Sequence, residues 1–265
     1  MPEQRDPATQ AAWAYERLHV DALFRVWADP VLDAAAVGPG ESVLDVACGT
    51  GVLARAAYDR VGPQGTVTGS DIDPGMLAVA ASIEPGIRWV QAEAGQQPLE
   101  DDCCDAVVSQ FGMMFFPDPV AAVREMVRCT RPGGLVVVAV WDDLERSPVY
   151  PAWVDLLQRR AGTAAADALR APFVLGDVAR LQGLFEAAGA APVSITSERR
   201  PAVFPSVRSM AEADLRGWLP VLGVHLDDDL VEDLLAEAEE FLAAYVAADG
   251  RMVFDAPAHL VVVRA

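Results

Sequence analysis

The stretch that decides the fold is VLDVACGTG, residues 43–51. It begins as a short apolar run that holds one acid, Asp45, and ends as a turn of small residues. Gly49 and Gly51 in that turn allow the backbone to approach a ligand closely. A helical pattern follows over residues 51–60. A strand that passes through a glycine-rich turn into a helix opens a βαβ unit, and open α/β sheets bind small molecules at such turns.

The same alternation of strands and helices continues after this stretch. Apolar, Val-rich runs predict buried strands, at residues 42–47, 65–71, 86–92, 105–110 and 134–141. Helical patterns lie between them at 75–82 and 119–130. Such alternation predicts an α/β fold with a doubly wound, mostly parallel sheet.

The two ends of the chain show a looser pattern. Helices are predicted at 11–28 and 30–37 before the sheet, and at 149–160, 177–188, 207–217 and 228–247 after it. Two further strands are predicted at 191–204 and 258–264. The segment 206–250 is longer than a plain connection between these strands requires, so we expect a helical insertion before the last strand. No repeat or Gly/Ser linker divides residues 1–265, which predicts one domain.

Composition excludes several classes of function. The formal charge of −19 disfavours binding to nucleic acid or to an anionic membrane. The chain has no Lys, which excludes a pyridoxal Schiff base and the P-loop lysine. Its four cysteines and three histidines show no metal-ligand spacing, so we expect no metal. The polar start and the short apolar runs predict a protein without a membrane segment, in the reducing cytoplasm.

A second acid points to a nucleoside ligand. Asp71 ends the next predicted strand, 20 residues after Gly51, where an acid can accept both hydroxyls of a ribose. A dinucleotide would also place its pyrophosphate on the glycine turn, where the carboxylate of Asp45 repels it. S-adenosylmethionine instead carries a positive sulfonium and amino group, which that carboxylate attracts. The residues therefore favour S-adenosylmethionine, with S-adenosylhomocysteine as the product.

Residues 40–142 resemble class I S-adenosylmethionine-dependent methyltransferases, in the small-molecule branch that includes the ubiquinone and menaquinone biosynthesis enzymes. The matching motifs are VLDVACGTG (43–51), GSDIDPGMLAVA (69–80), QAEAGQQPLEDD (91–102), VSQFGMMFFPDP (108–119), and RPGG (131–134) followed by LVVVAVW (135–141). The resemblance implies a Rossmann-like methyltransferase fold with seven strands, the last antiparallel. It divides the domain into an N-terminal helical lid (1–38), a cofactor-binding half (40–142) and a substrate-side elaboration (143–265).

The resemblance also implies a set of cofactor-binding residues. Asp71 would hold the ribose, Ile72 and Met76 would flank the adenine, and Glu93 and the amide of Ala94 would meet its edge. The full predicted set is Asp45, Ala47, Cys48, Gly49, Gly51, Asp71, Ile72, Met76, Glu93, Ala94 and Ser109.

Residues near the methyl acceptor are predicted from chemistry. An acceptor that carries a proton needs a general base, for which the candidates are Tyr15 and His19 on the N-terminal helix and His225 in the insertion, with His225 preferred. Aromatic and Met side chains build adaptable apolar walls. The predicted substrate-binding residues are Trp13, Phe111, Met114, Phe115, Arg216 and Trp218.

The sequence thus predicts methyl transfer to a small, aromatic or lipophilic metabolite by a monomer or homodimer. The alternative is a protein of the same fold that binds the cofactor without methylating, as a sensor or a partner protein. The cofactor loop would be identical in both. A nicotinamide oxidoreductase is opposed by Asp45 and by the absence of a Tyr-x-x-x-Lys pair.

Overall fold

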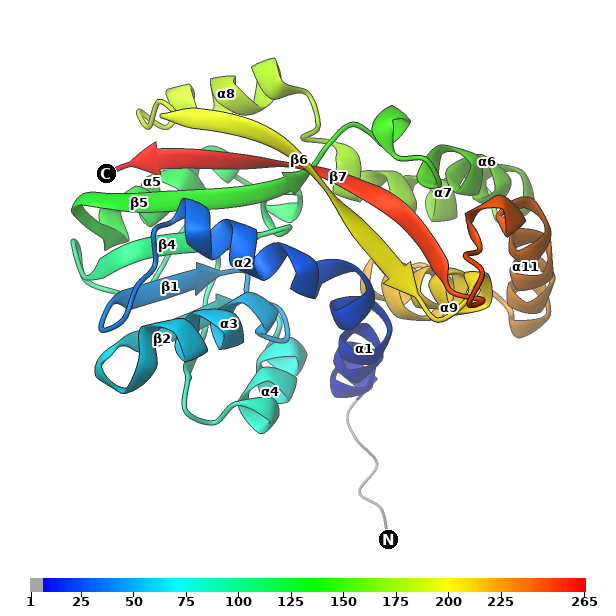
Figure 1. Ribbon diagram of the computed structural model, residues 1–265, viewed down its shortest axis with the longest axis horizontal. Helices are drawn as coiled ribbons and strands as arrows, with labels where there is room; N and C mark the ends of the chain where they lie inside the picture. The colour runs from blue at the N-terminus through cyan, green and yellow to red at the C-terminus, as the bar shows by residue number, and fades with distance from the viewer. Residues whose placement is uncertain (1–6) are drawn as a thin grey trace, which may run out of the picture.

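The strand that carries Asp45 is β1 (Ser42–Val46), and it lies inside a seven-stranded sheet of order β3-β2-β1-β4-β5-β7-β6 in the computed structural model, which describes residues 7–265 (Figure 1). The other strands are β2 (Thr66–Asp71), β3 (Arg88–Gln91), β4 (Cys104–Gln110), β5 (Thr130–Trp141), β6 (Ser194–Phe204) and β7 (Met252–Arg264). β1 to β5 pair in parallel, whereas β7 is antiparallel to both of its neighbours. The predicted seven-stranded, mostly parallel sheet is confirmed.

Both faces of this sheet are buried, as continuous apolar strands require. Along β5, Val136, Val138 and Val140 face one core cluster, and Val137 and Ala139 face the other. The helices of the cofactor half are α2 (Arg25–Ala34), α3 (Val52–Val61), α4 (Pro74–Ile83) and α5 (Pro119–Cys129). α2 and α3 pack on the face of Val137 and Ala139, and α5 packs on the opposite face together with α8 (Val178–Ala187).

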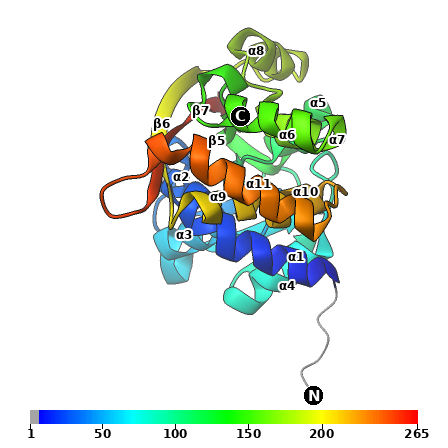
Figure 2. The same ribbon diagram turned by 90° about the vertical axis from the view of Figure 1, so that its right-hand side faces the viewer.

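The N-terminal part differs from the prediction of two separate helices. α1 (Pro7–Tyr15), a π-helical segment η1 (Glu16–Phe24) and α2 run on without a break, and Pro30 lies inside α2. α1 packs beside α4 in both ribbon views, whereas η1 and α2 enter the main core (Figures 1 and 2). Trp27 is completely buried there. η1 and α2 thus belong to the main core, whereas α1 packs mainly beside α4.

The last two strands form a ribbon longer than the sequence predicts. Residues 252–257 pair with β6 alone, because β5 pairs only with residues 258–264. Asp255 and Pro257 interrupt the apolar pattern there, which is why the prediction begins the strand at 258. Figure 1 shows the ribbon reaching away from the sheet toward α9 and α11.

The segment between β6 and β7 is the expected helical insertion. It contains α9 (Val207–Glu212), a second π-helical segment η6 (Ala213–Trp218), α10 (Leu219–Val221) and α11 (Asp228–Phe241). α11 ends six residues earlier than predicted, and α7 (Thr163–Arg170), which was not predicted, follows α6 (Tyr150–Arg160). Within residues 7–265, no helix has the length and apolar character needed to cross a membrane.

Candidate functional site

A cavity of about 710 Å³ opens at the carboxyl ends of β1, β2 and β4. Open α/β sheets bind ligands at this edge. Most of the predicted cofactor residues line it: Asp45, Ala47, Cys48, Gly49, Asp71, Ile72, Met76, Glu93 and Ala94. Gly51 does not line the cavity and faces the ring of Trp89 instead. Ser109 is buried and does not line the cavity either.

The turn after β1 owes its shape to three residues with left-handed backbone, Ala47 (φ 57°), Gly49 (φ 54°) and Gly51 (φ 87°). Its amides bond to the end of β2: the Cys48 amide donates to the Ser70 carbonyl at 2.9 Å, and the Gly49 amide donates to Asp71 Oδ2 at 2.8 Å. An alanine in the left-handed region stores strain of about 1–3 kcal/mol, and such strain concentrates at functional sites. The same conformation recurs at Phe111 (φ 56°), directly after β4.

Replacing Gly51 by alanine is expected to destabilise the protein by about 2–4 kcal/mol. Its Cβ would lie 2.4 Å from Cη2 of Trp89, and its backbone is left-handed. Gly40→Ala is the matched control, because Gly40 has φ 85° but nothing within 4 Å of an added Cβ. Urea denaturation measures both. Equal losses in the two variants would show that the Trp89 contact does not restrict this position.

Asp45 places a buried carboxyl group in the lining of the cavity. Its side chain is 1% exposed, and neither carboxylate oxygen has a hydrogen-bond partner among the described residues. Burial raises the pKa of Asp45 well above its usual value and the nearby charge of Asp71 raises it further, although the backbone amide of Ala54 acts in the opposite direction. A buried carboxylate without a partner is costly to a protein. The arrangement therefore fits a cationic ligand and opposes a pyrophosphate.

The carboxylate of Asp71 is oriented so that it can accept hydrogen bonds from hydroxyl groups. Its Oδ2 accepts from the Gly49 amide at 2.8 Å, and its Oδ1 accepts from the Asp73 amide at 2.9 Å. Burial raises the pKa of Asp71, while these two amide bonds oppose the rise. Each carboxylate oxygen has a second lone pair, so the oriented side chain can still accept from two ribose hydroxyls.

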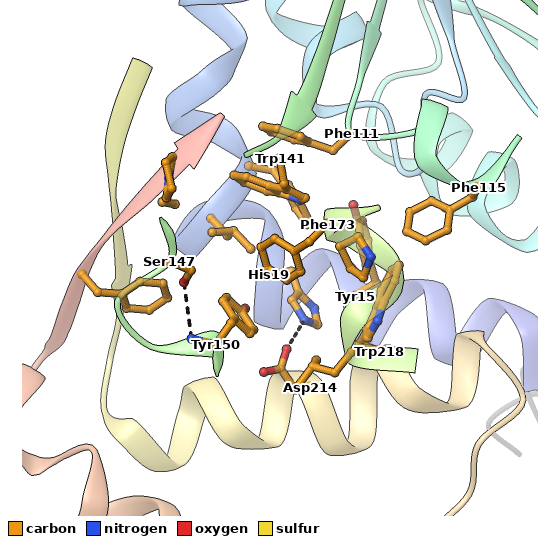
Figure 3. Close-up of a pocket in the computed structure, with 17 residues that line it drawn as sticks. Tyr15, His19, Phe111, Phe115, Trp141, Ser147, Tyr150, Phe173, Asp214 and Trp218 are labelled. Atoms are coloured by element: carbon orange, nitrogen blue, oxygen red, sulfur yellow. Dashed lines mark hydrogen bonds and ion pairs between the residues drawn. The ribbon is translucent and has the colours of Figure 1, made fainter. Parts of the chain in front are cut away.

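A second, smaller cavity of about 60 Å³ adjoins the first (Figure 3). The residues that line both cavities are all aromatic: Tyr15, Phe24, Phe111, Phe115 and Trp218. They come from the N-terminal helices, from the segment after β4 and from the insertion. The two cavities thus meet at a ring of aromatic side chains.

The wall beyond this ring is also aromatic. Phe111 and Trp141 stack with their ring centroids 3.6 Å apart and their planes 3° from parallel, and Tyr150 and Phe173 pack with centroids 5.2 Å apart. Apolar pockets of this kind with few polar groups bind small apolar ligands. Among the polar residues that line this cavity are Ser147, His19 and Asp214, and Figure 3 shows His19 and Asp214 facing each other.

His19 and Asp214 form a buried pair, each side chain being no more than 5% exposed. His19 Nε2 lies 3.7 Å from Asp214 Oδ1. Trp153 Nε1 donates to the other oxygen, Oδ2, at 2.9 Å. Burial raises the pKa of Asp214, although His19 and the Trp153 hydrogen bond act in the opposite direction.

The structure places several predicted site residues elsewhere. His225, the preferred base, is exposed in the segment after α10 and lines neither cavity, so the structure does not bring it to the site. Arg216, predicted to bind substrate, pairs with α11 instead: Nη1 lies 2.8 Å from Asp228 Oδ1 and Nη2 lies 3.1 Å from Glu232 Oε1. Trp13 packs against the cluster of Ala12, Met76 and Val79. Met114 packs between the two cores.

Tyr15 lines both cavities. Burial raises its pKa far above the usual range, and the charges of Asp71, Glu16 and Asp45 add to the rise. The phenol therefore stays protonated at neutral pH and forms part of the aromatic wall. His19 lines the second cavity and has the carboxylate of Asp214 beside it.

Sequence reasoning missed several residues of the second cavity. The additional residues are Phe24, Trp141, Tyr150, Phe173 and Asp214. The aromatic ones follow the periodicity of ordinary core residues, so the sequence carried no signal that separates them from core. Asp214 lies in the helix predicted at 207–217, and the structure buries it. An acid on the buried face of that helix was the sequence feature that could have indicated a site residue. No metal-binding group of three or more ligands occurs within residues 7–265.

Comparison with known proteins agrees with this geometry. Residues 44–138 match the sequence family described as a methyltransferase domain. A demethylmenaquinone methyltransferase of Staphylococcus aureus is 39% identical over 130 residues, which are 46% of this chain and 54% of that protein. Residues 44–138 are therefore similar to a methyltransferase domain. The aligned part spans only about half the length of these curated relatives.

Solved structures extend the likeness of the methyltransferase domain to the whole fold. A protein described as a methyltransferase from an antibiotic biosynthesis pathway of Anabaena variabilis has a TM-score of 0.66 at 15% identity, over 90% of this chain and 96% of its own. An S-adenosylmethionine-dependent methyltransferase of Aquifex aeolicus has a TM-score of 0.55 at 18% identity, over 70% of this chain and 91% of its own. The buried carboxylate of Asp45 and the oriented carboxylate of Asp71 would suit the positive charge and the ribose of S-adenosylmethionine.

Proposed function

We propose that the protein transfers a methyl group from S-adenosylmethionine to a small, apolar, aromatic metabolite. The observation that carries the proposal is the ring of five aromatic residues, which joins a cavity suited to the cationic donor to an acceptor cavity with aromatic walls. When bound, S-adenosylmethionine supplies an electrophilic methyl group on a positively charged sulfur. The acidic cavity matches the positive charge of the donor, and the aromatic cavity matches the apolar surface of the acceptor.

The chain contributes mainly orientation and exclusion of water. Asp71 would hold the ribose and Asp45 would balance the positive charge of the donor, so the methyl group is directed toward the aromatic ring. Phe111 and Trp141 would hold a flat acceptor in line with the bond that breaks. Positioning reactants about 3–3.5 Å apart in a dry site supplies a large share of the rate of such displacements.

The proposal also assigns the N-terminal α1 as a lid. Tyr15 at its end lies over the glycine turn, since a Cβ at Gly49 would be 3.9 Å from Tyr15 Cε1. α1 packs on α4 rather than on the sheet. Movement of α1 would open the donor cavity while the core residues of η1 and α2 stay in place.

Incubation of the purified protein with methyl-labelled donor and a bacterial metabolite extract tests the proposed function. We expect S-adenosylhomocysteine to accumulate and mass spectrometry to find the label in one small aromatic or lipophilic compound. The Asp71→Ala variant serves as the blank, because it should not retain the donor. Tight donor binding without any labelled product or S-adenosylhomocysteine would overturn the proposal in favour of a non-methylating binding protein.

A further inference from the structure

Two π-helical segments meet beneath the acceptor cavity. η1 carries His19, and η6 carries Asp214. They approach closely at Gly217, where an added Cβ would lie 3.0 Å from Cε1 of His19. π-helical turns are rare in proteins and occur frequently at functional sites. The local backbone therefore departs from α-helical geometry where two elements from opposite ends of the chain bring a histidine and an acid together.

The hydrogen bonding of His19 is incomplete. Both ring nitrogens are buried, and neither has a hydrogen-bond partner among the described residues. The other buried histidine, His259, is saturated: Nδ1 lies 2.8 Å from Ser197 Oγ, and Nε2 lies 2.9 Å from the Gly176 carbonyl. Buried polar groups are normally satisfied. An unsatisfied imidazole in the wall of an apolar cavity is therefore positioned for a ligand rather than for the fold.

Asp214 is held in one orientation by its other contact. The Trp153 indole donates to Oδ2 at 2.9 Å, which leaves Oδ1 directed toward His19. The 3.7 Å separation of Oδ1 and His19 Nε2 exceeds a hydrogen bond. Catalytic hydrogen bonds are often long in ligand-free structures and shorten when the reactants bind.

We propose that His19 is the general base for methyl transfer to a hydroxyl group, that Asp214 is its positioning residue, and that the acceptor is a phenol or an enol. This inference rests on the proposed function and deepens it. The second cavity suits the hydroxyl end of a neutral, flat, weakly acidic compound, because its lining holds aromatic rings, one imidazole, one carboxylate and the Ser147 hydroxyl, with no Arg or Lys among the residues that line it. The rest of such a compound would extend into the larger adjoining cavity.

The proposed step balances as follows. The acceptor oxygen forms a bond to the methyl carbon, and the carbon–sulfur bond breaks with its electron pair remaining on sulfur. The hydroxyl proton passes to an imidazole nitrogen of His19. The products are the methyl ether, neutral S-adenosylhomocysteine and an imidazolium ion, which the carboxylate of Asp214 stabilises until the proton leaves for solvent.

The other titratable groups around His19 do not compete for this role. Tyr15 stacks on the imidazole with ring centroids 5.5 Å apart, and Tyr150 lines the same cavity. Burial raises the pKa of each phenol, so both stay neutral at pH 7. Glu16 on η1 is paired with Arg55, at 2.8 Å between Oε1 and Nη2.

The test uses 2-naphthol, whose ionised form is distinguished by its absorption spectrum, bound to the protein with S-adenosylhomocysteine. Imidazole accepts the naphthol proton and forms an ion pair, so the bound probe should ionise at lower pH in the wild type than in His19→Gln, by about one pH unit or more. Asp214→Asn should lie between them. His225→Gln, which changes an exposed histidine, should match the wild type.

Turnover with S-adenosylmethionine and 2-naphthol provides the second readout. His19→Gln should lose about 10²–10⁴-fold in kcat at neutral pH. The loss should shrink at high pH, where the naphthol ionises without a base. A merely structural histidine would not give this pH rescue.

The possible failures of the two proposals are distinguishable. Calorimetry with S-adenosylmethionine comes first: absence of binding to the wild type would overturn the proposed function itself. With donor binding intact, three results would each overturn the inference: no binding of 2-naphthol, equal ionisation of the probe in wild type and His19→Gln, or transfer to 2-naphthylamine with none to 2-naphthol.

Discussion

Asp71→Ala is expected to lower the affinity for S-adenosylmethionine by about 10²–10⁴-fold. Two hydroxyl hydrogen bonds to a charged acceptor contribute about 1.5–3 kcal/mol each, and each 1.4 kcal/mol is a factor of ten in the dissociation constant. The substitution also frees the Gly49 and Asp73 amides that the carboxylate holds. The glycine turn then loses its connection to the end of β2, so both the contact and its scaffold are affected.

Isothermal titration calorimetry measures the effect of Asp71→Ala. Asp59→Ala is the matched control, since it removes the same charge from an exposed position on α3. The control should bind the donor like the wild type. If Asp71→Ala bound the donor within about threefold of the wild type, the assignment of Asp71 to the ribose would be wrong, because two charged hydrogen bonds cannot be lost at so small a cost.

Asp45→Asn is expected to change binding and stability in opposite directions. The carboxylate is buried without a hydrogen-bond partner among the described residues, so removing its charge should stabilise the ligand-free protein by about 1–3 kcal/mol. The same change removes the counter-charge of the donor, and affinity should fall by about 2–5 kcal/mol, or 30-fold to several thousand-fold. Substitution of a residue that stabilises the fold would instead lower the stability of the ligand-free protein.

The control for this prediction is another buried acid that has partners. Asp142 lies 3.1 Å from His259 Nε2 and accepts from the Asp143 amide at 2.8 Å. Asp142→Asn should therefore lower the unfolding temperature of the ligand-free protein, whereas Asp45→Asn raises it. Differential scanning calorimetry compares the two. A lower unfolding temperature for Asp45→Asn would contradict the interpretation that the Asp45 carboxylate is unpaired in the ligand-free protein and pairs with a bound cation.

The same carboxylate should make donor binding depend on pH. Burial raises the pKa of Asp45 in the free protein, and a bound cation lowers it again. Binding between these two pKa values releases a proton, so affinity should rise with pH through that interval and level off above the pKa of the free protein. In Asp45→Asn the dependence should be flatter, with the raised pKa of Asp71 as its remaining source.

The donor half of the site could be predicted from the sequence because its determinants are local. The turn of residues 43–51 needs small residues at fixed positions, and Asp71 follows at the end of the next strand. Adjacent parallel strands bring these residues to one edge of the sheet, at a spacing set by strand length and pairing. Nine of the eleven predicted cofactor residues line one cavity for this reason.

The acceptor half could not be predicted in the same way. His19 lies in η1 and Asp214 in η6, almost 200 positions later in the chain. Their approach depends on the β6–β7 ribbon, which carries the insertion over the edge of the sheet where η1 crosses it. His225 looked favourable only because it lies near Trp218 in sequence, and the turn after α10 directs it to solvent.

What the sequence determined by itself is therefore the sheet and the place of the donor, since hydrophobic periodicity and glycine turns act over a few residues. What only the tertiary structure decided is the environment of the acceptor. Its aromatic ring and its histidine–acid pair are assembled from segments that neighbour each other only after packing. Which side chain then lies in an apolar cavity without a partner is set by that packing, and no local pattern encodes it.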